Sequence, residues 1–207
     1  MWGGRTYSGA GSTTTYLDRN EVWALNLKSY AWTQILSETP FVFNALASSA
    51  IYKNQFLTFG GENTVGGHYR NEMFSLDLSS GSKETGCSLT WASKTLGNNA
   101  PSARYEGMSA VYDNKMLIIG GYSGNRESAI YEIDLDSGST TEITTQGDVS
   151  FVGASGTSGV HWQNEEGDTY VAIFGGYTTN GKVNSLYIYD TKEKELSQPT
   201  TSGSGPS

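Results

Sequence analysis

Four short blocks of the chain alternate between apolar and polar side chains, and each block follows a pair of glycines. The blocks are residues 20–26, 71–77, 128–134 and 184–190. Alternation with a period of two residues is the pattern of a β-strand that buries one face. A glycine pair lets the preceding apolar run end in a backbone conformation or a close contact that a side chain would disfavour. Each block and its glycine pair therefore predict two strands joined through a corner.

This two-strand unit recurs at a nearly constant distance along the chain. The second glycines of the pairs are Gly4, Gly61, Gly121 and Gly176. Successive pairs thus lie 57, 60 and 55 residues apart. Each block also carries an aromatic side chain, and these are Trp23, Phe74, Tyr131 and Tyr187. Matching blocks at this period predict one continuous array of stacked repeats.

The repeats resemble those of the kelch family. The resemblance rests on the glycine pairs, on the aromatic residue of each block, and on two later tryptophans, Trp32 and Trp91. It extends over nearly the whole chain. Kelch repeats fold as blades of a β-propeller, so the resemblance implies an all-β protein with antiparallel four-stranded blades. Each blade would contain an inner strand, a strand that ends in the glycine pair, the alternating strand and an outer strand.

The resemblance also assigns the remaining strands. The inner strands are expected at residues 46–52, 107–112 and 156–162. Their small side chains suit the crowded axis, and the aromatic residues of the alternating strands fill the wedges between blades. The outer strands are expected at residues 31–35, 90–95, 140–144 and 195–198. Ile143 and Leu196 stand where the family usually has tryptophan, which predicts looser packing at the rim of those two blades.

The chain divides into one partial blade and three complete ones. Residues 1–38 form the partial blade, residues 39–98, 99–147 and 148–198 the complete blades, and residues 199–207 a linker toward another blade. Closed propellers of this family commonly have six or seven blades, so we interpret the chain as part of a propeller. Unpaired strand edges and bare apolar faces attract other chains. We therefore expect association with further blades, with a second copy, or with a partner that supplies a strand.

Charge and composition indicate which classes of partner and which cellular compartment suit this chain. Thirteen Lys and Arg against 21 Asp and Glu give a net charge of −8, so the chain lacks the excess of cations that attracts nucleic acid. No segment approaches the run of about 18 apolar residues that spans a membrane. The single cysteine, Cys87, excludes an intrachain disulfide and favours a cytoplasmic protein. The alternative is an extracellular, surface-anchored kelch protein.

The residues that could support catalysis are few. His68, His161 and Cys87 lie far apart in the sequence, which is not the spacing of a zinc or copper site. Galactose oxidase, a kelch enzyme, uses a tyrosine cross-linked to a cysteine, whereas Cys87 is expected near the rim. Three carboxylates cap one predicted hairpin turn, at Glu165, Glu166 and Asp168. We predict a protein without enzymatic activity, cofactor or metal. The alternative is a kelch enzyme or specifier protein, similar to galactose oxidase or to nitrile-specifier proteins, with its site in other blades.

Binding of a protein or peptide is better supported, because a propeller presents loops from every blade on one rigid face. In kelch adaptors of ubiquitin ligases, partner-binding residues follow the glycine pairs or precede the inner strands. Carried over to this chain, these positions are Arg5, Glu62, Asn63, Tyr122, Ser123 and Tyr177, together with Arg104 before an inner strand. The alternative for Arg104 is a structural role between blades, and for the tyrosines packing over the glycine corner. We therefore predict a protein-interaction scaffold.

Overall fold

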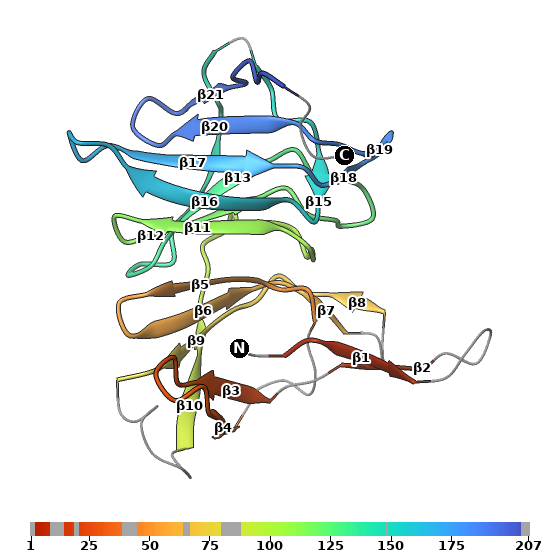
Figure 1. The fold of residues 1–207 in the computed structure, drawn as a ribbon, viewed down its shortest axis with the longest axis vertical. Helices are drawn as coiled ribbons and strands as arrows, with labels where there is room; N and C mark the ends of the chain where they lie inside the picture. The colour runs from red at the N-terminus through yellow and green to blue at the C-terminus, as the bar shows by residue number, and fades with distance from the viewer. Residues whose placement is uncertain are drawn as a thin grey trace.

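The computed structural model describes residues 3–8, 15–18, 21–38, 45–63, 67–79, 88–147 and 149–203 (Figure 1). These residues form strands and turns and no helix, so none of them forms an apolar helix that could cross a membrane. The prediction of an all-β chain is confirmed. The expectations that concern Cys87 and the final residues 204–207 lie outside the described residues.

Three blades each contain four antiparallel strands, which overlap the strands predicted from the sequence. The second blade comprises β5 (Ser48–Tyr52), β6 (Gln55–Phe59), β9 (Met73–Asp77) and β10 (Ser88–Lys94). The third comprises β11 (Met108–Tyr112), β12 (Lys115–Ile119), β13 (Ile130–Asp134) and β14 (Thr140–Ile143). The fourth comprises β16 (Ser158–Gln163), β17 (Thr169–Phe174), β20 (Leu186–Asp190) and β21 (Glu195–Ser197).

The first blade is represented by β3 (Val22–Leu25) and β4 (Trp32–Glu38), which pair antiparallel. β4 also pairs in parallel with the start of β10, so the first and second blades share one six-stranded sheet. A similar parallel bridge joins Gln146, after β14, to Glu195 on β21. Backbone pairing along the outer rim therefore links neighbouring blades, a feature that the sequence did not predict.

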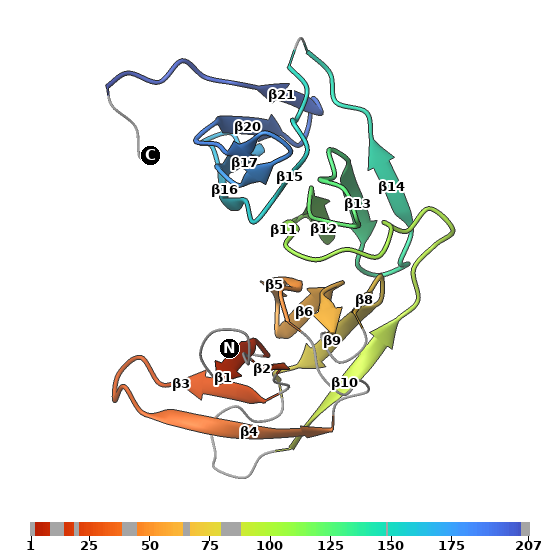
Figure 2. The ribbon, with the colours of Figure 1, turned by 90° about the vertical axis from the view of Figure 1, so that its right-hand side faces the viewer.

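The blades fan out in an open arc (Figure 2), with β5, β11 and β16 toward its middle and β4, β10, β14 and β21 along its rim. Hydroxyl groups connect the inner strands. Ser48 Oγ donates to the carbonyl oxygen of Gly107 at 2.8 Å, and Ser109 Oγ donates to that of Ser49 at 2.7 Å. Small residues at these positions thus let the inner strands approach closely, as the sequence predicted.

Short additional strands gather at one end of the blades, on the right of Figure 1 and facing the viewer in Figure 2. These short strands are β1 (Arg5–Ser8), β2 (Thr15–Asp18), β7 (Glu62–Asn63), β8 (His68–Tyr69), β15 (Ala154–Ser155), β18 (Tyr177–Thr178) and β19 (Gly181–Lys182). They pair as β1 with β2, as β7 with β8, and as β18 with both β15 and β19. The segments that follow the glycine pairs or precede the inner strands form this end, which we call the loop face.

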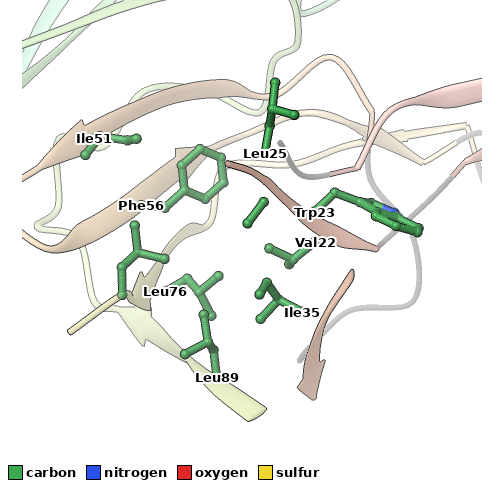
Figure 3. A pocket seen from close by; sticks show the side chains of 10 residues that line it. Val22, Trp23, Leu25, Ile35, Ile51, Phe56, Leu76 and Leu89 are labelled. Atoms are coloured by element: carbon green, nitrogen blue, oxygen red, sulfur yellow. The ribbon is translucent and has the colours of Figure 1, made fainter. Parts of the chain in front are cut away.

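Apolar cores fill the spaces between adjacent blades. Between the second and third blades, Leu57 and Phe59 pack with Val111 and Ile118. The core between the third and fourth blades includes Leu117, Ile119, Val171, Ile173, Tyr187 and Tyr189. β20 buries one face, as its alternation predicts, whereas four consecutive residues of β9 are buried because blades pack against both of its faces. Figure 3 shows Leu76 of β9 on the face toward the first blade. Adjacent blades are therefore joined over their whole width by apolar contacts.

The prediction of loose packing at the rim of the last two blades is wrong. Ile143 on β14 and Leu196 on β21 are both buried in the core between the third and fourth blades. Phe151 packs in the same core. By strand register Leu196 stands at the position of Trp91, whereas in the third blade this position is held by Thr140 and not by Ile143.

The first glycines of the second and third pairs lie against the backbone of the next blade. Gly60 and Gly120 have φ angles of 68° and 63°. A Cβ atom would lie 2.4 Å from the carbonyl oxygen of Arg104 in the first case, and 2.4 Å from that of Ala154 in the second. The second glycine of each pair donates its N–H to the same carbonyl, at 2.8 Å in both blades. The glycine pair thus allows a blade-to-blade hydrogen bond that any side chain would block.

We expect Gly120→Ala to lower the free energy of unfolding by about 2 to 3 kcal/mol, because the new methyl group adds a backbone clash to the cost of positive φ. Gly156 is the matched control: its φ is 64°, close to that of Gly120, but no atom lies within 4 Å of the Cβ position. Gly156→Ala should cost about 1 kcal/mol. Urea denaturation measures both values, and equal costs would show that the contact with Ala154 contributes nothing.

Candidate protein-binding face

Six of the seven predicted binding residues follow the glycine pairs on the loop face, and the seventh, Arg104, precedes β11. Arg5 lies on β1, Glu62 and Asn63 lie on β7, and Tyr177 lies on β18. Tyr122 and Ser123 follow the third glycine pair, where Tyr122 forms isolated bridges with Tyr105 and Arg126. Segments from four repeats therefore contribute to one surface.

Arg5 and Glu62 form an ion pair with each other. Nη2 of Arg5 lies 2.9 Å from Oε2 of Glu62, and both side chains are partly buried. The pair joins the β1–β2 hairpin to the second blade. Opposite charges that are already paired attract a third charge weakly, so these two residues do not make this part of the face strongly basic or acidic.

A row of tyrosines crosses the loop face from the second blade to the third. The ring of Tyr69 on β8 lies 5.0 Å from that of Tyr105 and 6.0 Å from that of Tyr122, and the last two rings are 5.4 Å apart. Such tilted contacts are favourable arrangements for aromatic rings. Only Tyr122 of these three was predicted from the sequence.

Arg126 continues the row toward the fourth blade. Its guanidinium carbon lies 4.6 Å from the ring centre of Tyr122 and 4.8 Å from that of Tyr177. Cation–π contacts with two rings hold the guanidinium in place. Its side chain donates no hydrogen bond within the described part of the chain, so its N–H groups are available to a partner. We call Tyr69, Tyr105, Tyr122, Arg126 and Tyr177 the tyrosine–arginine row.

The environment of Tyr105 favours its neutral phenol. Burial raises the pKa of Tyr105 to about 12, with a further contribution from the negative charge of Glu62. At neutral pH its hydroxyl group is therefore protonated and can donate a hydrogen bond. Together with the Arg126 guanidinium, this hydroxyl gives the row hydrogen-bond donors beside its apolar area.

Arg104 is buried, whereas the other predicted residues are partly or fully exposed. Its side chain is 1% exposed. Nη1 donates to the carbonyl oxygen of Gly120 at 3.0 Å, Nε and Nη2 donate to Ser102, and Nη2 lies 4.0 Å from the Glu127 carboxylate. The Ser123 hydroxyl donates to the same carboxylate. These contacts favour the alternative that Arg104 has a structural role between blades. We therefore do not include Arg104 in the binding site that we propose.

A hollow of about 760 Å³ lies beside Tyr177, where the third and fourth blades meet at the loop face. Glu106, Ser155, Lys182 and Asn184 contribute polar groups to its wall. Within it, Ser155 Oγ donates to the Glu106 carboxylate at 2.7 Å. Tyr177 is 47% exposed at its edge. The hollow thus combines an accessible aromatic ring with donors and acceptors for hydrogen bonds.

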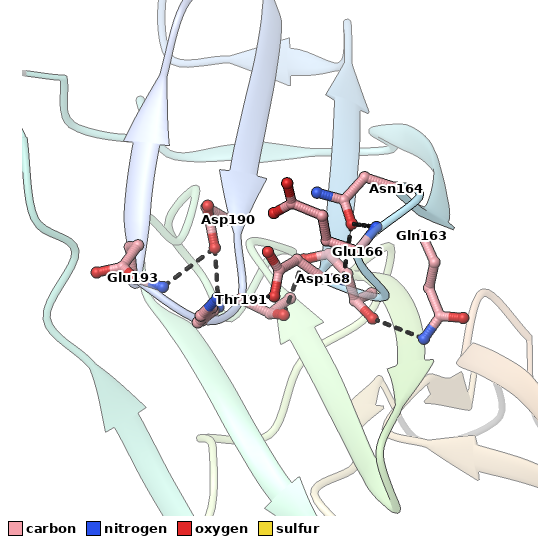
Figure 4. A network of polar contacts seen from close by, with 9 residues as sticks. Gln163, Asn164, Glu166, Asp168, Asp190, Thr191 and Glu193 are labelled. Carbon is pink, nitrogen blue, oxygen red and sulfur yellow. Dashed lines mark hydrogen bonds and ion pairs between the residues drawn. The ribbon is translucent and has the colours of Figure 1, made fainter.

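Polar side chains at the opposite end of the blades cap turns. Asn164 Oδ1 accepts hydrogen bonds from the N–H groups of Glu166 and Asp168, and the Asp190 carboxylate accepts from that of Glu193 (Figure 4). Lys192 Nζ lies 3.0 Å from Asp168 Oδ1. The turn at residues 164–168 is therefore capped by the Asn164 amide and not by the carboxylates that the sequence indicated.

Metal-ligating side chains do not converge within the described residues. No group of three or more His, Cys, Asp or Glu side chains there could hold a metal ion. His68 on β8 and His161 on β16 are both exposed and lie on different blades. His161 lies beside Trp162 at a hollow where the hairpin ends of the inner strands meet.

Comparison with known proteins identifies related sequences. A family model described as the KLHDC2/KLHL20/DRC7 Kelch-repeats domain matches residues 1–165. The chain is 26% identical over 212 residues to human Kelch domain-containing protein 2 and 23% identical over 210 residues to mouse Kelch domain-containing protein 1. Both alignments cover 100% of this chain, but only 42% and 41% of the two relatives. The chain thus spans about two fifths of the length of these relatives.

Proposed function

The chain belongs to the kelch-repeat family, and from this premise we propose that it is an interaction scaffold that binds a protein partner on its loop face. Proteins with kelch domains are generally non-enzymatic interaction scaffolds. The tyrosine–arginine row is the observation that carries the proposal. It joins three blades and presents the residue types that dominate binding hot spots.

The row suits binding because its side chains are ordered before a partner arrives. Tyr122 and Tyr177 lie on either side of the Arg126 guanidinium, at 4.6 and 4.8 Å. A side chain that is already fixed loses less conformational entropy on binding. The guanidinium can therefore donate to partner oxygens at a lower entropic cost than a freely moving arginine.

The hollow beside Tyr177 extends this surface toward the fourth blade. Its volume of about 760 Å³ can hold several side chains of an extended segment. Polar groups of both charges line it, so it selects a partner by hydrogen bonding and shape. We propose that a partner segment crosses the row and places one side chain in this hollow.

Photo-crosslinking tests where the partner binds. A photoreactive amino acid at Tyr177 is expected to capture a defined protein from cells that express the protein naturally. The same group at Lys192, in a hairpin turn at the opposite end of the fourth blade, is the control. Capture from Lys192 with none from Tyr177 would place the partner elsewhere.

We expect Tyr177→Ala and Arg126→Ala each to weaken binding of the captured partner by more than about 1 kcal/mol. Neither side chain is buried, so the melting temperature should stay nearly unchanged. Isothermal titration calorimetry and thermal melts measure the two quantities. Thr179→Ala, at an exposed loop position, is the control. Unchanged affinity in both variants would contradict the proposal.

A further inference from the structure

Asn180 is the only asparagine of the chain that is followed by a glycine. Asn180 and Gly181 lie in the hairpin that joins β18 to β19, on the right of Figure 1. The side-chain amide of an asparagine contains a carbonyl carbon, Cγ, that the backbone nitrogen of the next residue can attack. A glycine has no Cβ atom to shield that nitrogen or to restrict the backbone around it.

The fold leaves this pair of residues open to solvent. Asn180 is exposed, and no atom lies within 4 Å of the Cβ position of Gly181, whose φ is 111°. Thr178 Oγ1 accepts a hydrogen bond from the backbone N–H of Asn180 at 3.2 Å and donates to the Gly181 carbonyl oxygen at 3.0 Å. The Asn180 side chain makes no hydrogen bond within the described residues. The turn is therefore held by Thr178, while the Asn180 amide is unrestrained and Gly181 is uncovered.

Other asparagines lack this combination. Asn164 is followed by a glutamate, and its Oδ1 atom accepts two backbone hydrogen bonds. Asn54 and Asn99 are exposed, as Asn180 is, but they are followed by glutamine and alanine. A side chain on the following residue crowds the attacking nitrogen. Asn54 and Asn99 are thus internal controls for the reactivity of Asn180.

We propose that Asn180 is a site of spontaneous deamidation that changes the charge and the shape of the loop face as the protein ages. The backbone nitrogen of Gly181 loses its proton and bonds to Asn180 Cγ, which closes a succinimide ring, while the Cγ–Nδ2 bond breaks and ammonia leaves. Water then opens the ring. Opening at Cγ gives aspartate, and opening at the backbone carbonyl carbon gives isoaspartate. The attack is intramolecular, so it needs neither an enzyme nor a cofactor.

Both products alter the hairpin next to the hollow. Each adds a negative charge two residues from Lys182, which lines the hollow beside Tyr177. Isoaspartate also lengthens the backbone between Asn180 and Gly181 by one atom, in a hairpin where Tyr177 pairs with Lys182. The longer turn weakens this pairing. The deamidation therefore acts on the site where a partner binds, a step that rests on the proposed function.

Incubation of the folded protein at mildly alkaline pH, followed by peptide mass spectrometry, tests the proposal. We expect the amino group of Asn180 to be replaced by a hydroxyl group at least about tenfold faster than that of Asn54 or Asn99. A methyltransferase that labels isoaspartate measures the share of this product. In the modified fraction, the amides of Tyr177 and Lys182 should exchange hydrogen with solvent faster.

Two variants and a peptide complete the test. Asn180→Gln moves the amide one methylene farther from the nitrogen and should stay unconverted, whereas Thr179→Ala keeps the Asn–Gly pair and should convert like the original protein. A synthetic peptide of residues 176–186 reports the reactivity without the fold. Conversion of this peptide while the folded protein keeps its Asn180 amide, or equal rates at Asn180 and Asn54, would overturn the proposal. These measurements need no partner, so their failure is distinct from a failure of the proposed function.

Discussion

Tyr187→Ala should lower the free energy of unfolding by about 3 to 5 kcal/mol. The Tyr187 side chain is 6% exposed in the core between the third and fourth blades, and its ring lies 5.5 Å from that of Phe151 in an edge contact. The two blades are hydrogen-bonded sheets that cannot move together to close the cavity, so the lost contacts are not replaced. Urea denaturation, with the slope checked for two-state behaviour, measures the loss.

The control for Tyr187→Ala needs an exposed position. Thr178 is unsuitable, because it is buried on β18 and its Oγ1 donates to the Gly181 carbonyl oxygen at 3.0 Å. Thr179, the next residue, is exposed. Thr179→Ala should change stability by less than about 0.5 kcal/mol. Equal shifts of the urea midpoint for Tyr187→Ala and Thr179→Ala would contradict the assignment of Tyr187 to the space between blades.

Arg104→Ala should lower the free energy of unfolding by about 3 to 4 kcal/mol. The substitution leaves the carbonyl oxygens of Ser102 and Gly120 without these donors, the second of them buried, and creates a cavity where a side chain that is 1% exposed was removed. Thermal and urea denaturation measure the loss. Arg104→Lys should retain part of the stability, because lysine keeps the charge but cannot reproduce the fork of donors.

Arg126→Ala provides the comparison for Arg104→Ala, because the two arginines differ in burial. Arg126 is only partly buried, so Arg126→Ala should change the free energy of unfolding by less than about 1 kcal/mol. The same substitution should weaken binding of the partner. Arg104→Ala should unfold the protein more readily and have no separate effect on binding. Weaker partner binding at unchanged melting temperature in Arg104→Ala would return Arg104 to the binding site.

The sequence alone determined the strands and their order. The alternation in residues 71–77 and 184–190 appears as β9 and β20, and the corners between strands lie at the glycine pairs. Both signals are local. Alternation reports which face of a strand is buried, and a positive φ favours glycine whatever surrounds it. The repetition of these signals then predicted blades of one kind.

Tertiary structure decided what each surface residue does. Arg104 and Arg126 are both arginines in segments between strands, but the next glycine corner covers Arg104 whereas Arg126 lies between two tyrosine rings. Tyr69 and Tyr105 meet only because adjacent blades place their loops side by side. Burial and contact across blades depend on how the sheets are rotated relative to one another, and no pattern within a single strand encodes that rotation. The strands could therefore be predicted from local periodicity, whereas the tyrosine–arginine row required the assembled arc.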